Sequence, residues 1–463
     1  MLTFEGQKFQ LCDKLPRRSF LQVGGLAMGG LSLPEILRAE DESRRTSPGL
    51  KTATQSSSLR SPHRAVIMIY LGGGPPHQDM LDLKPDAPSE TRGEFQPIAT
   101  KVPGIQISEL MPRVAAMMDK FAVIRSLVGS EGRHDSAECY TGRWLMSPQP
   151  ERGWPAIGST ISRLCGPVDP AVPPFVDLSQ RMKYQGWNTK GSGYLGSAHA
   201  PIRYDGATVR NMKLRDVSVE RLHQRTQLLR SLDRFRRDAD TQLATGGLDS
   251  YTEQAMGILT SPKLVEALDL EREDPQVRAR YGKDAPDALG EGQLAKGYAA
   301  LTSRLLLARR AVEAGVRCVT CSFAQFDWHT NNFSRARRVI PLLDQGIAAL
   351  VEDLHERGLE NDVTVVVWGE FGRSPKINNE AGRDHWPPVH AALLAGGGMK
   401  TGQVIGKTSG QAEEAIDRPV HMQEVFATMY HNLGIDVAST TIPDDTGRPL
   451  YLIDRHELIR ELV

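Results

Sequence analysis

The stretch "VVVWGEFGRSPKINNEAGRDHWP", residues 365–387, begins as a buried strand and ends in charged and ring-bearing side chains. Its apolar run ends at Trp368, Glu370 follows almost at once, and the pair Asp384 and His385 comes fourteen residues after Glu370. Ligands of an open parallel sheet bind beyond the carboxyl ends of its strands. The stretch therefore predicts a strand that delivers a metal site to the edge of a sheet, with a solvated loop as the alternative.

Other apolar runs predict further buried strands, because they lack the alternation of a sheet with one wet face. Strand and helix in alternation also predict right-handed parallel crossovers. The expected fold class is α/β, with a mostly parallel central sheet and helices on both faces. The predicted strands span 65–71, 121–127, 316–323, 363–368 and 391–397, and the predicted helices span 108–119, 136–146, 293–315, 334–357 and 421–434.

The length of 463 residues allows one large α/β domain or two smaller ones. We expect a single domain over residues 63–463. Residues 150–290 begin rich in Pro and Gly and end in charged helical patterns at 219–243 and 249–270. We interpret them as an insertion that covers the active edge of the sheet, rather than as a separate domain.

The N-terminal region predicts export. Arg17 and Arg18 precede a short, mildly apolar, Gly-rich run, whereas a membrane span needs about 20 apolar residues. The paired arginines favour the twin-arginine route, with an amphipathic first helix as the alternative. We predict a signal at 1–40, a flexible tether rich in Ser and Thr at 41–62, no membrane span in the mature chain, and a periplasmic or extracellular location.

Charge and cysteine usage exclude two other classes of function. Lys+Arg and Asp+Glu both total 56, so the formal net charge is zero and nothing favours nucleic acid as a partner. Cys318 and Cys321 form a C-x-x-C inside a predicted strand, where residues three apart point to opposite faces. We interpret both as core packing rather than as a redox pair or zinc knuckle.

Carboxylates and imidazoles follow four of the predicted strands. Both are ligands that Zn²⁺ and other divalent cations take in hydrolytic sites. Two metals about 4 Å apart would need ligands from several strands, and this pattern is consistent with that. The groups are His77, Asp79 and Asp82 after the first strand, Ser130, His134, Asp135 and Ser136 after the second, Asp327 and His329 after the third, and Glu370, Asp384 and His385 after the fourth.

Several motifs together resemble a known family. "VWGEFGRSPKIN" and "GRDHWP" are similar to the signature of the bacterial exported proteins called domain of unknown function 1501, which are placed within the alkaline phosphatase and sulfatase superfamily. The segments "YLGGGPPHQDMLDLKP", "YTGRW" and "FDWHTNN" carry the same resemblance, which covers residues from about 60 to 440. It implies a metal-dependent hydrolase fold that acts on phosphate or sulfate esters.

The resemblance also implies a set of metal ligands. By position, Asp327 and His329 would match the first metal-binding Asp and His of the superfamily, and His385 would match its late ligand His. The ligand after the first strand would be His77 or Asp79. Zinc is the expected metal, with manganese or calcium as alternatives.

One ligand departs from the pattern of the superfamily. Glu370 would stand where an Asp opens an Asp-His ligand pair, but Phe371 follows it in place of the His. One ligand is therefore missing unless Asp384 or His134 replaces it.

The nucleophile also departs from the sulfatase pattern. Sulfatases place Cys-x-Pro-Ser-Arg where this chain reads "GRHDSAE", so a formylglycine sulfatase is not expected. Ser130 or Ser136 would serve as a serine nucleophile. His134 and Arg143 would stabilise the developing negative charge.

The leading hypothesis is an exported, metal-dependent hydrolase of phosphate or sulfate esters, with a small-molecule or saccharide ester as substrate. Trp187, Tyr194 and His199 of the insertion would shape the pocket, with ordinary packing under a long loop as the alternative. The second hypothesis is a non-catalytic exported protein on the same fold that binds polysaccharide or a protein partner. The missing His after Glu370 and the missing nucleophile motif favour this second hypothesis. The number of candidate ligands that the chain keeps argues against it. A metal-dependent mutase fits the fold but not export.

Overall fold

The computed structural model describes residues 64–182, 184–204, 263–288 and 301–463, with four isolated residues between 220 and 227. The predicted signal at 1–40 and tether at 41–62 lie outside the described residues. So do most residues of the insertion's predicted charged helices and the first part of the predicted helix 293–315. The described residues all fall within one compact unit, Pro62–Val463.

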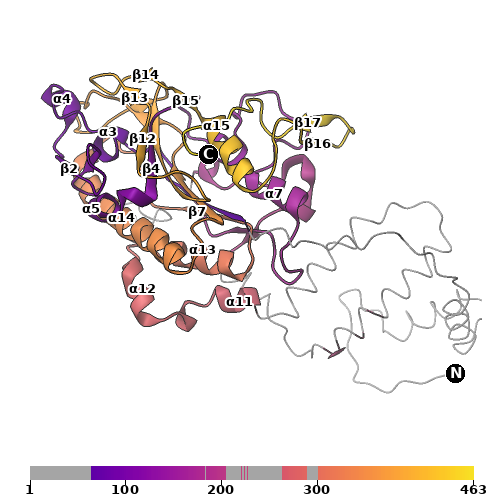
Figure 1. Ribbon diagram of the computed structural model, residues 1–463. Helices are drawn as coiled ribbons and strands as arrows, with labels where there is room; N and C mark the ends of the chain where they lie inside the picture. Colours follow the sequence, from indigo (N-terminus) through magenta and orange to yellow (C-terminus); the bar gives the residue numbers. More distant parts are fainter. Residues whose placement is uncertain are drawn as a thin grey trace, which may run out of the picture. The chain divides into compact units, whose positions relative to one another are not determined.

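A nine-stranded sheet forms the centre of this unit (Figure 1). The strand order is β12-β4-β11-β8-β1-β7-β5-β6, and β15 also pairs with β4. All pairs are parallel except those of β11 with β4 and β8. The strands are β1 (Ala65–Tyr70), β4 (Phe121–Val128), β5 (Phe175–Asp177), β6 (Ile202–Arg203), β7 (Cys318–Ser322), β8 (Val363–Trp368), β11 (His390–Gly396), β12 (Gln403–Ile405) and β15 (Val420–His421).

Helices cover both faces of the sheet, so the predicted fold class is confirmed. Ile67 and Ile69 of β1 belong to the core on one face, and Val66 and Met68 belong to the core on the other. The first core includes α5 (Pro112–Ala116), α13 (Ser303–Ala314) and α14 (Asn332–Glu356). The second includes α6 (Ala137–Thr141), α7 (Ile157–Cys165) and α15 (Met422–Asn432).

Two of the predicted helices are shorter than the sequence pattern indicated. α5 begins at Pro112, whose ring suits a first helical position, and a 3₁₀ turn at Met118–Lys120 follows the helix. α6 ends at Gly142, which adopts a left-handed conformation with φ 73°. The remaining elements are short: α3 (His77–Met80), α4 (Ser89–Arg92), β2 (Pro97–Ala99), β3 (Gln106–Ser108), η2 (Gln185–Trp187), η3 (Gly193–Leu195), η4 (Ser197–His199), α11 (Lys263–Ala267), η5 (Leu270–Arg272), α12 (Pro275–Tyr281), β9 (Gly372–Arg373), β10 (His385–Trp386), β13 (Lys407–Thr408), β14 (Ala415–Asp417), β16 (Thr441–Pro443) and β17 (Pro449–Tyr451).

Cys318 and Cys321 confirm the prediction of core packing. Both thiols are free and fully buried. Cys318 belongs to the core on one face of the sheet and Cys321 to the core on the other, as the spacing of three on a strand requires.

The antiparallel direction of β11 sets the path of the chain at the edge of the sheet. An antiparallel strand begins at the edge where its parallel neighbours end. The chain leaves β8 at Trp368 and enters β11 at His390. Both ends of residues 369–389 are therefore held at the carboxyl edge, and this loop carries Glu370, Asp384 and His385.

Described parts of the predicted insertion are built into the sheet and its helical layer. β5 pairs with β7 and extends the sheet. Further along, Tyr281 at the end of α12 donates its hydroxyl to Asp353 of α14 at 3.0 Å. Asp353 also pairs with the buried Arg309 at 2.7 Å. Among the described residues, no helix combines the length and apolarity that a membrane crossing requires.

Asp344 joins α14 to α5 and makes stability depend on pH. Its carboxylate accepts hydrogen bonds from the backbone N–H groups of Arg113 and Val114, at 3.0 and 2.8 Å. Burial raises the pKa of Asp344 to about 6, although these two bonds oppose the rise. The folded state therefore keeps a proton that the unfolded chain, with a pKa of about 3.9, has already lost.

We predict that the Asp344 carboxyl makes the free energy of unfolding fall as pH rises. Above pH 4 the unfolded state binds fewer protons than the folded state, so the free energy of unfolding should fall by up to about 3 kcal/mol by pH 7. Asp344→Asn cannot lose a proton, and its curve should lack this fall. Urea unfolding of both proteins at intervals from pH 4 to 7 measures the difference. Parallel curves for the two proteins would contradict the prediction.

Candidate metal centre

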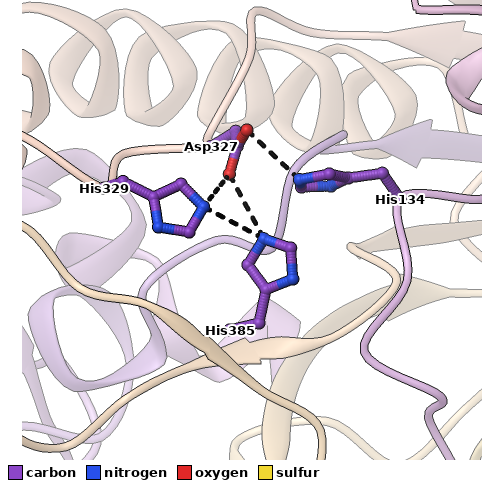
Figure 2. A group of neighbouring side chains, drawn as sticks. All are labelled: His134, Asp327, His329 and His385. Carbon is purple, nitrogen blue, oxygen red and sulfur yellow. Dashed lines mark hydrogen bonds and ion pairs between the residues drawn. The ribbon is translucent and has the colours of Figure 1, made fainter.

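Four side chains from three separate loops converge at the carboxyl edge of the sheet (Figure 2). They are His134, Asp327, His329 and His385, and one ligand atom from each lies within 4.8 Å of all the others. The Nε2 atoms of His329 and His385 lie 2.9 and 3.5 Å from Asp327 Oδ1, and His134 Nε2 lies 3.2 Å from Oδ2. Two ligand atoms that each lie about 2.0 Å from a tetrahedral zinc ion are about 3.3 Å apart from each other. The spacing thus fits one ion.

Two of the three imidazoles, those of His329 and His385, have an acceptor at Nδ1, whereas His134 Nδ1 has no hydrogen-bond partner among the described residues. His329 Nδ1 lies 2.8 Å from Asp384 Oδ1, and His385 Nδ1 lies 3.0 Å from the carbonyl oxygen of Gly132. These acceptors favour the tautomer with hydrogen on Nδ1, which leaves a lone pair on each Nε2. The Nε2 atoms of His329 and His385 are 3.1 Å apart. Two lone pairs facing each other at this distance repel unless a cation or a proton lies between them, so the donor set fits a metal ion.

Glu370 lies behind the third imidazole. Its Oε1 atom is 3.6 Å from His134 Nδ1, and it accepts hydrogen bonds from Gly73 N at 2.8 Å and Trp187 Nε1 at 2.9 Å. The sequence predicted Glu370 as a ligand and His134 mainly as a stabiliser of negative charge. The structure brings His134 into the cluster and places the buried Glu370 behind that ring, just beyond hydrogen-bond distance. The signal for His134 was its place after β4, on the edge that the other ligands share.

Neighbouring charges in the cluster shift the pKa values of His134 and Asp327. Burial alone would lower the pKa of His134, but hydrogen bonds and negative charge from Asp327 and Glu370 raise it to about 9. Burial alone would raise the pKa of Asp327, but bonds from His134, His385 and Arg373 hold it well below its usual range. Without metal, the protein thus favours a proton on His134, and a metal ion would have to displace it.

Arg373 fixes Asp327 from the inner side. Its fully buried guanidinium donates to the carbonyl oxygens of Gly73, Gly74 and Arg383, and to Asp327 Oδ1 at 2.6 Å. A fixed positive charge beside Asp327 repels a second divalent cation on that side. The geometry therefore favours a single ion over a pair.

Asp79 and Arg383 anchor the loop that carries three of the predicted ligands, Glu370, Asp384 and His385. Arg383 Nε and Nη2 lie 2.8 and 3.0 Å from the two carboxylate oxygens of Asp79, and both side chains are fully buried. Arg383 directly precedes Asp384 and His385. The structure places Asp79 outside the cluster, because a buried guanidinium needs a carboxylate with both oxygens engaged. Asn378, which the sequence did not single out, donates to Asp384 Oδ1 at 3.3 Å.

His77 also lies outside the cluster. It is buried beside His390, and its Nε2 atom is 3.2 Å from the carbonyl oxygen of Ala412. Burial lowers the pKa of His77 to about 4 and that of His390 to about 3. Both rings are therefore neutral and belong to the interior rather than to the site.

Arg143 and two residues of the insertion occupy a different region. Arg143 forms an ion pair with Asp454 and lies 3.7 Å from the ring centroid of Trp154. Tyr194 packs edge-on against the same Trp154 at 6.1 Å, and His199 bonds to a serine of α7. None of these contacts involves the four-residue cluster.

The two serines predicted as nucleophiles donate to backbone carbonyls. Ser130 Oγ donates to the carbonyl oxygen of Glu370 at 2.5 Å, and Ser136 Oγ donates to that of Asn188 at 2.7 Å. Ser136 is fully buried. Neither hydroxyl belongs to the cluster, so the structure presents neither as a nucleophile.

Aromatic rings of the insertion line one side of the cluster. The ring of Trp187 lies 4.9 Å from that of His134, and the half-exposed ring of Tyr184 lies 5.9 Å from it, both edge-on. Of the three insertion residues predicted to shape the pocket, Trp187 lies at the site.

The fold and the site together define an α/β protein with a candidate single-metal centre at the carboxyl edge of its sheet. Residues 63–463 match the family model described as "Protein of unknown function (DUF1501)". The chain belongs to this family, which confirms the resemblance of the sequence motifs. No curated protein sequence matches the chain.

Solved structures show only a remote likeness. The Zn complex of the C-terminal periplasmic domain of EcEptC from Escherichia coli is 10% identical, with 86% of this chain and 92% of that chain covered and a TM-score of 0.37. The lipoteichoic acid synthase LtaP from Listeria monocytogenes is 8% identical, with 87% and 78% covered and a TM-score of 0.38. The PsFucS1 sulfatase from Pseudoalteromonas sp. is 9% identical, with 80% and 68% covered and a TM-score of 0.33. Likeness at this level carries no argument about activity.

We predict that Gly186→Ala disrupts the centre. A Cβ at residue 186 would collide with the backbone oxygen of His134 and the ring of Tyr184. The resulting shift of η2 should break the Trp187–Glu370 bond, cost about 1–3 kcal/mol of stability and weaken metal binding. Urea unfolding and metal titration measure both effects. Gly191→Ala is the matched control, since its Cβ meets open space. Equal behaviour of the two variants would contradict the prediction.

We also predict that each chain binds one divalent ion through His134, Asp327, His329 and His385. Elemental analysis of His134→Ala and His329→Ala should show loss of the ion, whereas Glu370→Gln should lower its affinity about 10–100-fold. His431→Ala is the control, because His431 is exposed and outside the cluster. Loss of the ion in His77→Gln together with its retention in His134→Ala would contradict this assignment.

Proposed function

We propose that this protein is a metal-dependent hydrolase of phosphate or sulfate esters. The observation that carries the proposal is the convergence of three imidazole Nε2 atoms on the carboxylate of Asp327, with an acceptor at Nδ1 of both His329 and His385. Zinc suits this donor set best, and manganese or calcium are the alternatives. His134, Asp327, His329 and His385 would hold the ion.

A divalent cation in such a centre supplies polarisation of an ester oxygen and a lower pKa for a nearby water. The chain's own residues hold the donors in place. Asp384 orients His329, Arg373 fixes Asp327, and the negative charge of Glu370 lies 3.6 Å from His134 Nδ1. Because these side chains are already held in place, they need not rearrange when a substrate binds.

The cluster is open on one side. The side chain of His329 is 42% exposed and that of His385 is 29% exposed, whereas Glu370 behind the cluster is fully buried. We infer that an ester approaches from the side of these two histidines. The half-exposed ring of Tyr184 would border its path.

We infer that water, rather than a serine, attacks the ester. Ser130 and Ser136 both donate to backbone carbonyls, and the chain lacks the sulfatase formylglycine motif. The water oxygen would form a bond to phosphorus or sulfur while the bond from that atom to the ester oxygen breaks. The alcohol would leave with one proton of the water.

We further propose export by the twin-arginine route and a saccharide or small-molecule ester as substrate. The support for export is the sequence "LPRRSFLQVGG" together with the resemblance of the chain's motifs to a family of bacterial exported proteins. A non-catalytic protein that binds polysaccharide or a protein partner remains the alternative function.

The proposal predicts ester hydrolysis that requires metal. The full chain is stripped with a chelator, reloaded with zinc, manganese or calcium, and assayed with p-nitrophenyl phosphate, bis-p-nitrophenyl phosphate and p-nitrophenyl sulfate. One metal should restore activity, and His329→Ala should reduce it about 100-fold or more. His431→Ala should match the wild type. A protein that binds the ion but hydrolyses no ester faster than His329→Ala would point to the non-catalytic alternative.

A further inference from the structure

Arg335 lies in the first turn of α14, directly beside the metal centre. Its Nη2 atom donates to Thr330 Oγ1 at 3.4 Å, and Thr330 follows the ligand His329 in the chain. The side chain is half-buried. In the described part of the chain, no carboxylate lies within the 4 Å of an ion pair from its guanidinium.

The negative charge of Asp327 acts on this guanidinium. Burial lowers the pKa of Arg335, and the negative charge of Asp327 opposes that shift. Asp327 already bonds to Arg373 at 2.6 Å and belongs to the cluster. A divalent ion held by the cluster would take up the remaining charge of Asp327. Arg335 would then have no anionic partner within ion-pair distance among the described residues.

A half-buried guanidinium in that state favours an incoming anion. Its planar fork suits two oxygens of one tetrahedral oxyanion, which a lysine ammonium does not match. The neighbouring arginines of α14 differ. Arg337 pairs with Glu94 at 2.6 Å, and Arg338 is exposed, where water satisfies it.

We propose that Arg335 binds the non-bridging oxygens of a tetrahedral oxyanion at the metal centre, and so determines specificity for the charged part of the substrate. That the anion belongs to an ester to be cleaved rests on the proposed function. Anion binding itself rests on the position of Arg335 beside the cluster.

The test uses the full chain loaded with zinc and inorganic phosphate as the probe, with inorganic sulfate as a second probe. Isothermal titration measures affinity for wild type, Arg335→Gln, Arg335→Lys and the matched control Arg338→Gln, and elemental analysis of the same samples measures zinc. Arg335→Gln should bind phosphate about 10–100-fold more weakly than wild type at unchanged zinc content. The phosphate affinity of Arg335→Lys should lie between those of wild type and Arg335→Gln. That of Arg338→Gln should stay within about twofold of wild type.

Several outcomes would overturn the assignment of Arg335. They are equal phosphate affinity in Arg335→Gln and wild type, an equal loss in Arg338→Gln, absence of phosphate binding by wild type, and loss of zinc in Arg335→Gln. The last would show that Arg335 supports the centre instead. Phosphate binding that depends on Arg335, in a protein that cleaves no ester, would uphold this inference and defeat the hydrolase proposal.

Discussion

The arrangement of the candidate centre depends on the buried guanidinium of Arg373. A charge removed from water must have every donor bonded, and Arg373 meets this need with three backbone carbonyls and the carboxylate of Asp327. Those acceptors come from the segments after β1 and β7 and from the loop after β8. Because one rigid planar group bonds to all three, the segments are held in a single mutual position. The place of Asp327, and with it the places of His329 and His385 in the joined segments, follows from that constraint, whereas His134 comes from the loop after β4.

The loop after β8 meets the other two segments because β11 runs antiparallel to its neighbours. A parallel strand would have carried the chain away through a crossover to the opposite edge. Instead residues 369–389 begin and end at the carboxyl edge. The buried pair Arg383–Asp79 fastens this loop one residue before Asp384 and two before His385. A metal centre needs such support, because ligands held only by a free loop would pay the entropy of ordering on each binding event.

The site divides its carboxylates between two tasks. Asp327 faces the three imidazoles, Asp384 and Glu370 lie at the Nδ1 side of His329 and His134, and Asp79 pairs with Arg383, which holds the loop of His385. The exposed side chain of His329 and the proposed role of Arg335 are the features from which we infer the approach of an anion. For a family described only as having unknown function, this arrangement supplies a definite chemistry to examine.

The sequence by itself determined the core strands and the edge at which the chemistry lies, and it named seven candidate ligands, of which Asp327, His329 and His385 lie in the cluster. Those features depend on local apolar runs and on what directly follows each strand, and both can be read along the chain. Only the tertiary structure decided that His134 enters the cluster while Glu370 stands behind it. Which of two nearby side chains reaches a shared point depends on partners far away in sequence, such as Gly73 and Trp187. No local pattern records those partners, so the identity of the ligands had to come from the fold.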